Sequence, residues 1–146
     1  MVDERKAPDG YKVTEVGVIP EDWDIYPFGD YLDIFSGKGF SKSEYSSTGT
    51  KLIRIDNVSY GKITWDTVAY LPNYYKEIYS SLCLYEGDLL LALNRPITNG
   101  RLKFARLGAA DVPSILYQRV GKIVLNSQTV NHDFAFYILN KFITEF

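Results

Sequence analysis

The stretch that decides the fold is EGDLLLALNRPITNGRLKFARL, residues 86–107. Its apolar run, residues 89–93, predicts a strand buried on both faces, because apolar and polar residues do not alternate there. The pair Asn99-Gly100 follows within seven residues. This pair favours a two-residue hairpin turn, since both residues tolerate the positive φ that a type I′ turn requires. The stretch therefore predicts an antiparallel hairpin that begins with a buried strand.

The returning half of this hairpin carries most of its charge. Arg101 and Lys103 fall on one face of the pleat, and Leu102 and Phe104 on the other. Arg106 falls on the side of Leu102. The pleat thus separates a cationic face from a packed one, and a two-stranded ribbon is a shape that enters the major groove of DNA.

Charge is unevenly distributed along the chain, although the net charge is only -2. Residues 1–33 hold nine acids and three bases, whereas residues 34–146 hold nine acids and thirteen bases. Residues 89–122 hold six bases and one acid. Such asymmetry indicates contact with a polyanion. A solvated basic surface, balanced by acids elsewhere, is the alternative.

The remaining elements predict an α+β fold, a single domain with a mixed or antiparallel, strongly twisted sheet. Asn131 is expected to cap a C-terminal helix that presents Phe134, Tyr137, Ile138 and Phe142 on one face, and the family resemblance described below implies that this helix leads into a spacer helix. The other expected elements are an extended lead-in over residues 10–26, a short N-terminal helix over 28–35, a turn-rich loop over 37–50, two strands within 51–65, a short helix within 74–84 and a strand over 117–125.

The composition fits a globular, cytoplasmic protein. The 146 residues suffice for one domain with its own core. No apolar stretch approaches the ~20 residues that span a bilayer, and the first residues are polar and charged. A single cysteine, Cys83, excludes an internal disulfide. A cytoplasmic location with no membrane contact is the expectation.

Motifs of catalytic sites are incomplete. SGKGFSKS, residues 36–43, lacks the Ser or Thr after Gly-Lys that a phosphate-binding loop needs. His132 is the only histidine and falls in the first turn of the expected helix, where a solvated or capping role is favoured. Cys83 lies among apolar neighbours, which favours an inert buried thiol. The sequence predicts neither a catalytic residue nor a bound metal or cofactor.

Several segments together resemble a known family. They are GYKVTEVGVIPEDW (10–23), FGDYLDIFSGKGFS (28–41), TKLIRIDNVSYG (50–61), LYEGDLLLALNRPITNGRLKFARL (84–107) and SILYQRVGKIVLN (114–126). They are similar to a target recognition domain of the specificity subunit in a type I restriction–modification system. The lead-in is the most specific segment, and the resemblance covers nearly the whole chain.

The resemblance implies sequence-specific DNA binding without catalysis. A full subunit of the family has two such domains, and each reads one half of a bipartite DNA target. This chain would be the first of them, with a flexible N-terminus over residues 1–9 and the domain over 10–146. Methyltransferase subunits, which use S-adenosylmethionine, and a restriction subunit, which uses ATP with Mg²⁺, would be its partners.

Candidate DNA contacts follow from side-chain chemistry. Lysines suit phosphates, arginines suit phosphates or guanine, and amides suit adenine. The candidates are Lys38, Lys42, Arg54, Asn57, Tyr60, Arg95, Asn99, Arg101, Lys103, Gln118, Arg119 and Lys122. Arg54 and Arg119 fall within apolar runs, so each could instead pair with a buried acid. A different hypothesis is a protein-interaction module whose acidic, aromatic lead-in docks methyltransferase subunits without DNA contact.

Overall fold

The computed structural model describes residues 6–93, 102–126, 128 and 130–142. The chain divides into two compact units, residues 1–30 and 31–146. This boundary lies further along the chain than residue 9, where the sequence suggests that a flexible N-terminus ends. That the recognition domain begins at residue 10 stays a prediction.

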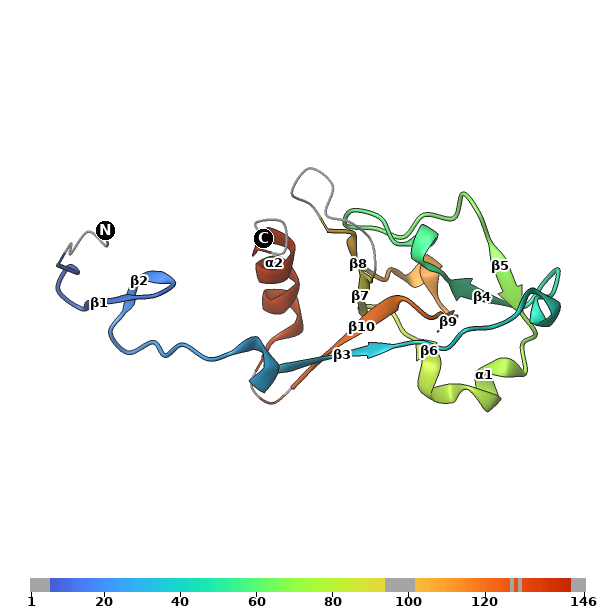
Figure 1. Cartoon of the computed structure of the whole chain (residues 1–146), viewed down its shortest axis with the longest axis horizontal. Helices are drawn as coiled ribbons and strands as arrows, with labels where there is room; N and C mark the ends of the chain where they lie inside the picture. The colour runs from blue at the N-terminus through green and yellow to red at the C-terminus, as the bar shows by residue number, and fades with distance from the viewer. Residues whose placement is uncertain (1–5, 94–101, 127, 129, 143–146) are drawn as a thin grey trace. The chain divides into compact units, whose positions relative to one another are not determined.

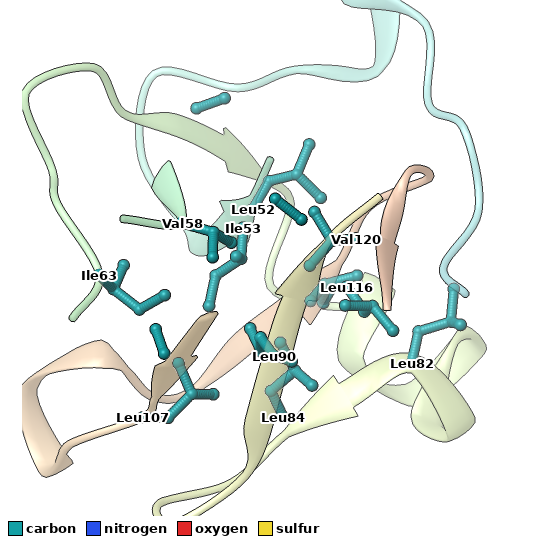
Figure 2. Packing of buried hydrophobic residues seen from close by; sticks show 14 of the residues in the cluster. Leu52, Ile53, Val58, Ile63, Leu82, Leu84, Leu90, Leu107, Leu116 and Val120 are labelled. Carbon is teal, nitrogen blue, oxygen red and sulfur yellow. The ribbon is translucent and has the colours of Figure 1, made fainter. Parts of the chain in front are cut away.

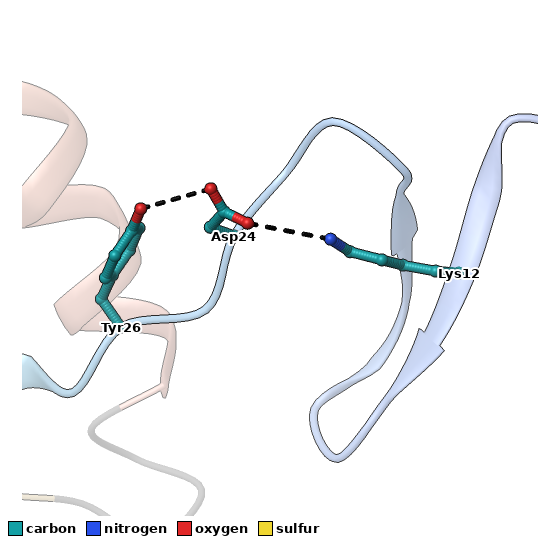
Figure 3. Close-up of polar contacts among 3 residues, drawn as sticks. All are labelled: Lys12, Asp24 and Tyr26. Carbon is teal, nitrogen blue, oxygen red and sulfur yellow. Dashed lines mark hydrogen bonds and ion pairs between the residues drawn. The ribbon is translucent and has the colours of Figure 1, made fainter.

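The smaller unit is built on a β-hairpin (Figure 1). Strands β1 (Tyr11–Thr14) and β2 (Gly17–Pro20) pair antiparallel, and Thr14 Oγ1 donates a hydrogen bond to the Gly17 carbonyl at 2.6 Å. Lys12 Nζ lies 3.9 Å from an Asp24 carboxylate oxygen, and Tyr26 donates to the other oxygen at 3.2 Å (Figure 3). None of the described residues of this unit is buried, so polar contacts and strand pairing, rather than a core, organise it.

The larger unit holds two four-stranded sheets among its described residues. The first has the order β3 (Leu32–Ser36), β10 (Val120–Leu125), β7 (Leu89–Ala92), β8 (Phe104–Arg106), with each neighbouring pair antiparallel. The second has the order β5 (Ala69–Leu71), β4 (Thr50–Ile53), β9 (Ser114–Leu116), β6 (Cys83–Leu84), and in it β4 and β9 are parallel. The α+β class with mixed and antiparallel pairing is confirmed, but the strands are divided between two separate sheets.

The main core joins the two sheets (Figure 2). Leu90 and Val120 from the first sheet pack with Leu52, Ile53 and Leu116 from the second, and each of these five side chains is fully buried. Burial of such a side chain contributes about 1.5–3 kcal/mol. This core fixes the position of the β9–β10 connection relative to β4 and β7.

A second core lies under the C-terminal helix α2 (His132–Phe142). Ala135 and Leu139 pack with Leu89, Phe104 and Ile123 of the first sheet. Asn131 caps the helix as expected, because its Oδ1 accepts a hydrogen bond from the Phe134 amide at 3.1 Å. Neither helix described in the structure is long and apolar enough to cross a bilayer.

The face of α2 that holds Phe134, Tyr137 and Ile138 is not the face that is most buried. Phe134 and Tyr137 are 62% and 70% exposed, while Ala135 and Leu139 are buried. Phe136 stacks on Phe104 with ring centroids 5.7 Å apart. This contact rotates the apolar stripe by about one residue from the expected face. The side chain of Phe142 lies outside the described part.

Residues 28–35 do not form the expected N-terminal helix. Phe28–Asp30 makes a single 3-10 turn, and β3 follows at Leu32–Ser36. The spacing of Phe28, Leu32 and Phe35 fits a helix, but pairing with β10 satisfies the same backbone groups in a strand. The expected helix within residues 74–84 reduces to α1 (Tyr75–Ile78) and a 3-10 turn at Ser80–Leu82.

The hairpin predicted from residues 86–107 is present as the antiparallel pair β7 and β8. Phe104 is 1% exposed and lies toward α2, and Arg106 on the same side pairs with Asp133 at 2.7 Å. The pleat assignment of Phe104 and Arg106 is therefore confirmed. The turn at Asn99-Gly100, with Arg95 and Arg101, lies outside the described residues.

Candidate nucleic-acid interface

One end of the first sheet collects candidate residues that lie next to three of its strands. The register places Ser36, Gly121, Leu91 and Phe104 in one row across β3, β10, β7 and β8. Just beyond this row lie Lys38 after β3, Arg119 before β10 and Lys103 before β8. We call this region the basic end of the sheet and define it by Lys38, Tyr60, Lys103, Gln118 and Arg119.

A tight turn, residues 117–120, forms the middle of the basic end. The Val120 amide donates to the Tyr117 carbonyl at 3.4 Å, so Gln118 and Arg119 occupy the corner positions, and both are exposed. Arg119 has φ of 65°, in the left-handed region. The expectation of a continuous strand over residues 117–125 is therefore wrong for its first three residues, and Arg119 does not lie inside a strand.

The strands on either side fix this turn. The Gln118 amide donates to the Lys38 carbonyl at 3.1 Å, and the Leu93 amide donates to the Arg119 carbonyl at 2.8 Å. The Tyr117 amide donates to the Ile53 carbonyl at 3.2 Å. Hydrogen bonds from the β3, β7 and β4 segments thus hold both corner residues in one backbone conformation.

The Gly-Lys-Gly segment after β3 has a structural explanation. Lys38 forms a parallel bridge with Tyr117. A Cβ added at Gly37 would overlap the carbonyl oxygens of Leu116 and Tyr117, and one added at Gly39 would lie 2.7 Å from Gln118 Oε1. Gly37 is therefore needed for the chain to run this close to the turn, whereas at Gly39 the exposed Gln118 side chain could move aside. The Gly-rich segment positions Lys38 rather than cradling a phosphate.

Aromatic rings support the Lys38 side chain. Its Nζ lies 4.8 Å from the centroid of Phe40 and 5.4 Å from that of Tyr79, contacts worth about 0.5–1 kcal/mol at an exposed site. Phe40 is buried and also packs on Tyr75 and Tyr117. The ammonium is thus held over a rigid apolar base while its outer side stays exposed.

A carboxylate lies near this base. The Ser41 amide donates to Glu44 at 2.8 Å, and this hydrogen bond lowers the pKa of Glu44. Tyr75 donates to the same carboxylate at 3.2 Å, and burial together with this bond raises the pKa of Tyr75 to about 12. Glu44 therefore stays ionised and partly offsets the charge of Lys38. The exposed Lys42 lies in the same 3-10 turn, Lys42–Glu44.

Lys103 and Tyr60 form the other side of the basic end. Lys103 Nζ lies 6.0 Å from the centroid of the Tyr60 ring. The Gly61 amide donates to the Phe104 carbonyl at 2.7 Å, which ties the Tyr60 loop to the edge of β8. The structure therefore brings these two candidates together from segments 43 residues apart.

Arg54 adjoins the basic end through β4. Its Nη2 donates to Thr67 Oγ1 at 3.3 Å, and its buried Nε has no hydrogen-bond partner among the described residues. Burial is the main cause that raises the pKa of the neighbouring Tyr45, and interaction with Tyr117 raises it further. Arg54 acts in the opposite direction and lowers this pKa. In the described part of the chain Arg54 pairs with no acid, unlike the alternative considered from sequence.

Two candidates are engaged within the fold. Asn57 is 0% exposed: its Oδ1 accepts from the Arg54 amide at 3.0 Å, and its Nδ2 donates to the Thr64 and Thr67 carbonyls at 3.0 and 2.8 Å. Its polar atoms are thus occupied in folding the loop after β4. Lys122 pairs with Asp88 at 3.3 Å, and their side chains are only 25% and 16% exposed. A phosphate contact by Lys122 stays a prediction, and this ion pair would compete with it.

Sequence reasoning missed the residues that position the site. Gly37, Gly39, Phe40 and Tyr79 hold Lys38 and the turn in place. The repeated glycine in SGKG was the only visible signal, because the aromatic contacts join segments about 40 residues apart. Arg95, Asn99 and Arg101 cannot be placed, since they lie outside the described residues.

Known proteins similar to this chain share one description. The type I restriction enzyme MjaVIII specificity subunit of Methanocaldococcus jannaschii is 46% identical over 129 residues, which are 88% of this chain and 30% of that protein. Over this domain, the chain is similar to type I restriction enzyme specificity subunits. The EcoAI specificity subunit of Escherichia coli is 32% identical over 116 residues, 80% of the chain and 20% of that protein. No family model matches the chain.

These matches confirm the resemblance drawn from the sequence. The chain spans only 30% and 20% of the length of these two specificity subunits. The shared part includes most of the larger unit, so the basic end is a feature of the region that matches.

Proposed function

We propose that the chain binds double-stranded DNA and reads one half of the bipartite target of a type I restriction–modification complex. The observation that carries this proposal is the basic end of the first sheet. Lys38, Lys103 and Arg119 come from three separate segments and lie at the same end of this sheet, although the chain as a whole carries a net charge of -2. A fold that concentrates cations in this way neutralises phosphates and gains affinity by releasing counterions.

The chemistry of the site divides into two tasks. Lys38 and Lys103 each place an ammonium beside an aromatic ring, and Lys38 is exposed while Lys103 is half-buried, so both ammonium groups suit phosphate contact. Tyr60 offers a ring for a sugar or a base. The exposed turn of Gln118 and Arg119 supplies groups that can reach base edges.

The proposal assigns no catalysis or cofactor to the chain. Methyltransferase subunits would bring S-adenosylmethionine, and a restriction subunit would bring ATP with Mg²⁺. The chain would direct both to the target and would work in the cytoplasm, where its DNA target lies. Selection of the target, rather than reaction chemistry, is then its contribution.

Salt dependence of DNA binding tests this proposal. Fluorescence anisotropy of a labelled duplex is measured at several salt concentrations for the wild type and for the double variant Lys38→Ala/Lys103→Ala. If each lysine neutralises one phosphate, the slope of log K against log salt becomes shallower by about 1.8 in the double variant. The variant Lys6→Ala/Lys12→Ala removes the same charge from the smaller unit and keeps the wild-type slope.

A second function is supported by the smaller unit. Residues 6–30 carry six carboxylates against two lysines, with Val16 and Trp23 largely exposed. An acidic, apolar surface repels DNA and suits a protein partner such as a methyltransferase subunit. If the wild type fails to bind any duplex at low salt, but still binds methyltransferase subunits, this interaction-module function replaces DNA recognition.

A further inference from the structure

The backbone at Arg119 has an unusual conformation. It is the one non-glycine residue with positive φ among the described residues, and the other such positions are glycines. A left-handed conformation is unfavourable for a residue with a Cβ, and glycine would adopt it freely. Folding alone therefore favours glycine at this position, and the arginine side chain needs another explanation.

The turn presents Arg119 without using it in the fold. The Arg119 side chain is exposed, and the described residues offer it no hydrogen bond, ion pair or ring contact. Its neighbour Gln118 differs, because its amide lies over Gly39 in the space that a Cβ would occupy. Arg119 is therefore the projecting side chain of the turn.

Rigid presentation is what base recognition requires. Hydrogen bonds from Val120 to Tyr117, from Gln118 to Lys38 and from Leu93 to Arg119 fix the turn. Strain that the surroundings hold in place is a recurrent feature of binding sites, where it pre-organises a group. A phosphate contact needs no such precision, and the flexible lysines beside the turn already suit it.

We propose that Arg119 is a specificity-determining residue that recognises a guanine through its major-groove edge. The inference rests on the proposed DNA-binding function and names the contact that supplies its sequence preference. The planar guanidinium donates two parallel hydrogen bonds to O6 and N7 of guanine, a pattern that other base pairs do not match. Lys38 and Lys103 lie to either side along the sheet and would hold the flanking phosphates.

The test is selection of bound sequences from a pool of random duplexes by the wild type and by variants at position 119. The wild type should enrich a motif with an invariant guanine. Arg119→Ala and Arg119→Lys should lose discrimination at that one position, by about 5- to 150-fold, while still binding DNA at low salt. Lysine keeps the positive charge but lacks the two parallel donors of the guanidinium, so Arg119→Lys distinguishes base recognition from phosphate attraction.

Arg119→Gly supplies the structural control. It should keep or raise the urea midpoint of unfolding, because glycine accepts the left-handed conformation, and yet lose the guanine preference. If Arg119 had only a structural role, a variant with unchanged or higher stability would keep the guanine preference. An unchanged motif in Arg119→Ala or Arg119→Lys would overturn the inference and leave DNA binding intact. A wild type that binds DNA but enriches no sequence would also overturn it, and one that binds no duplex would overturn the proposed function as well.

Discussion

Replacement of Asn57 by alanine should unfold the loop after β4 without changing what the protein recognises. The side chain makes hydrogen bonds with the Arg54 amide and with the Thr64 and Thr67 carbonyls at 3.0, 3.0 and 2.8 Å. At about 1 kcal/mol for each bond, Asn57→Ala should cost roughly 3 kcal/mol of a total stability of about 5–15 kcal/mol. With a urea m-value of about 1.5 kcal/mol per M, the unfolding midpoint should fall by about 2 M.

The assay is urea unfolding followed by tryptophan fluorescence or circular dichroism. Asn57→Asp keeps the acceptor for the Arg54 amide but sets a carboxylate against two carbonyl oxygens, so it should destabilise at least as much. Gln118→Ala is the matched control, because it removes an exposed amide and should shift stability by less than about 0.5 kcal/mol. A wild-type midpoint for Asn57→Ala, together with an altered sequence preference, would refute the structural role and restore Asn57 as a reader.

Two further predictions concern the support of the basic end. Gly37→Ala should lower the free energy of unfolding in urea by about 1–3 kcal/mol, because the added Cβ meets the backbone of Leu116 and Tyr117. Gly29→Ala, with open space around it, is the control and should be nearly neutral. Equal midpoints for the two variants would show that the segment at Gly37 does not pack closely against Leu116 and Tyr117. The stability difference between the wild type and Glu44→Gln should be present at neutral pH and vanish as pH falls through the lowered pKa of Glu44, since a depressed carboxyl pKa stabilises the fold only while the group is ionised. A difference that persists unchanged into acid would exclude this linkage.

Local signals predicted the elements whose structure depends on local chemistry. The apolar run predicted β7, which pairs antiparallel with β8, and Asn131 predicted the start of α2, whereas the Asn99-Gly100 turn lies outside the described residues. The same reasoning failed for residues 32–36, which have helical spacing but pair with β10, almost 90 residues away. Tertiary pairing overrides such weak local preferences.

The site was harder to predict than the fold for the same physical reason. Nothing in YQRV marks a turn, since it contains no Gly, Pro or Asn, and the left-handed Arg119 is imposed by hydrogen bonds from other strands. Asn57 and Lys122 have the chemistry of DNA contacts, but burial and pairing decide their roles. Residue type suggested the chemistry of these candidates, and only the packing showed that Asn57 and Lys122 are engaged within the fold.

Mapping of backbone amide chemical shifts by NMR on addition of a short duplex at low salt tests the central claim most directly. Non-specific binding of about 10⁻⁴–10⁻⁶ M is readily followed at the concentrations used for NMR. The account predicts the largest shifts at the basic end, that is, at Lys38, Tyr60, Lys103, Gln118 and Arg119. Shifts confined to the β1–β2 hairpin or to α2, with the basic end unchanged, would contradict it.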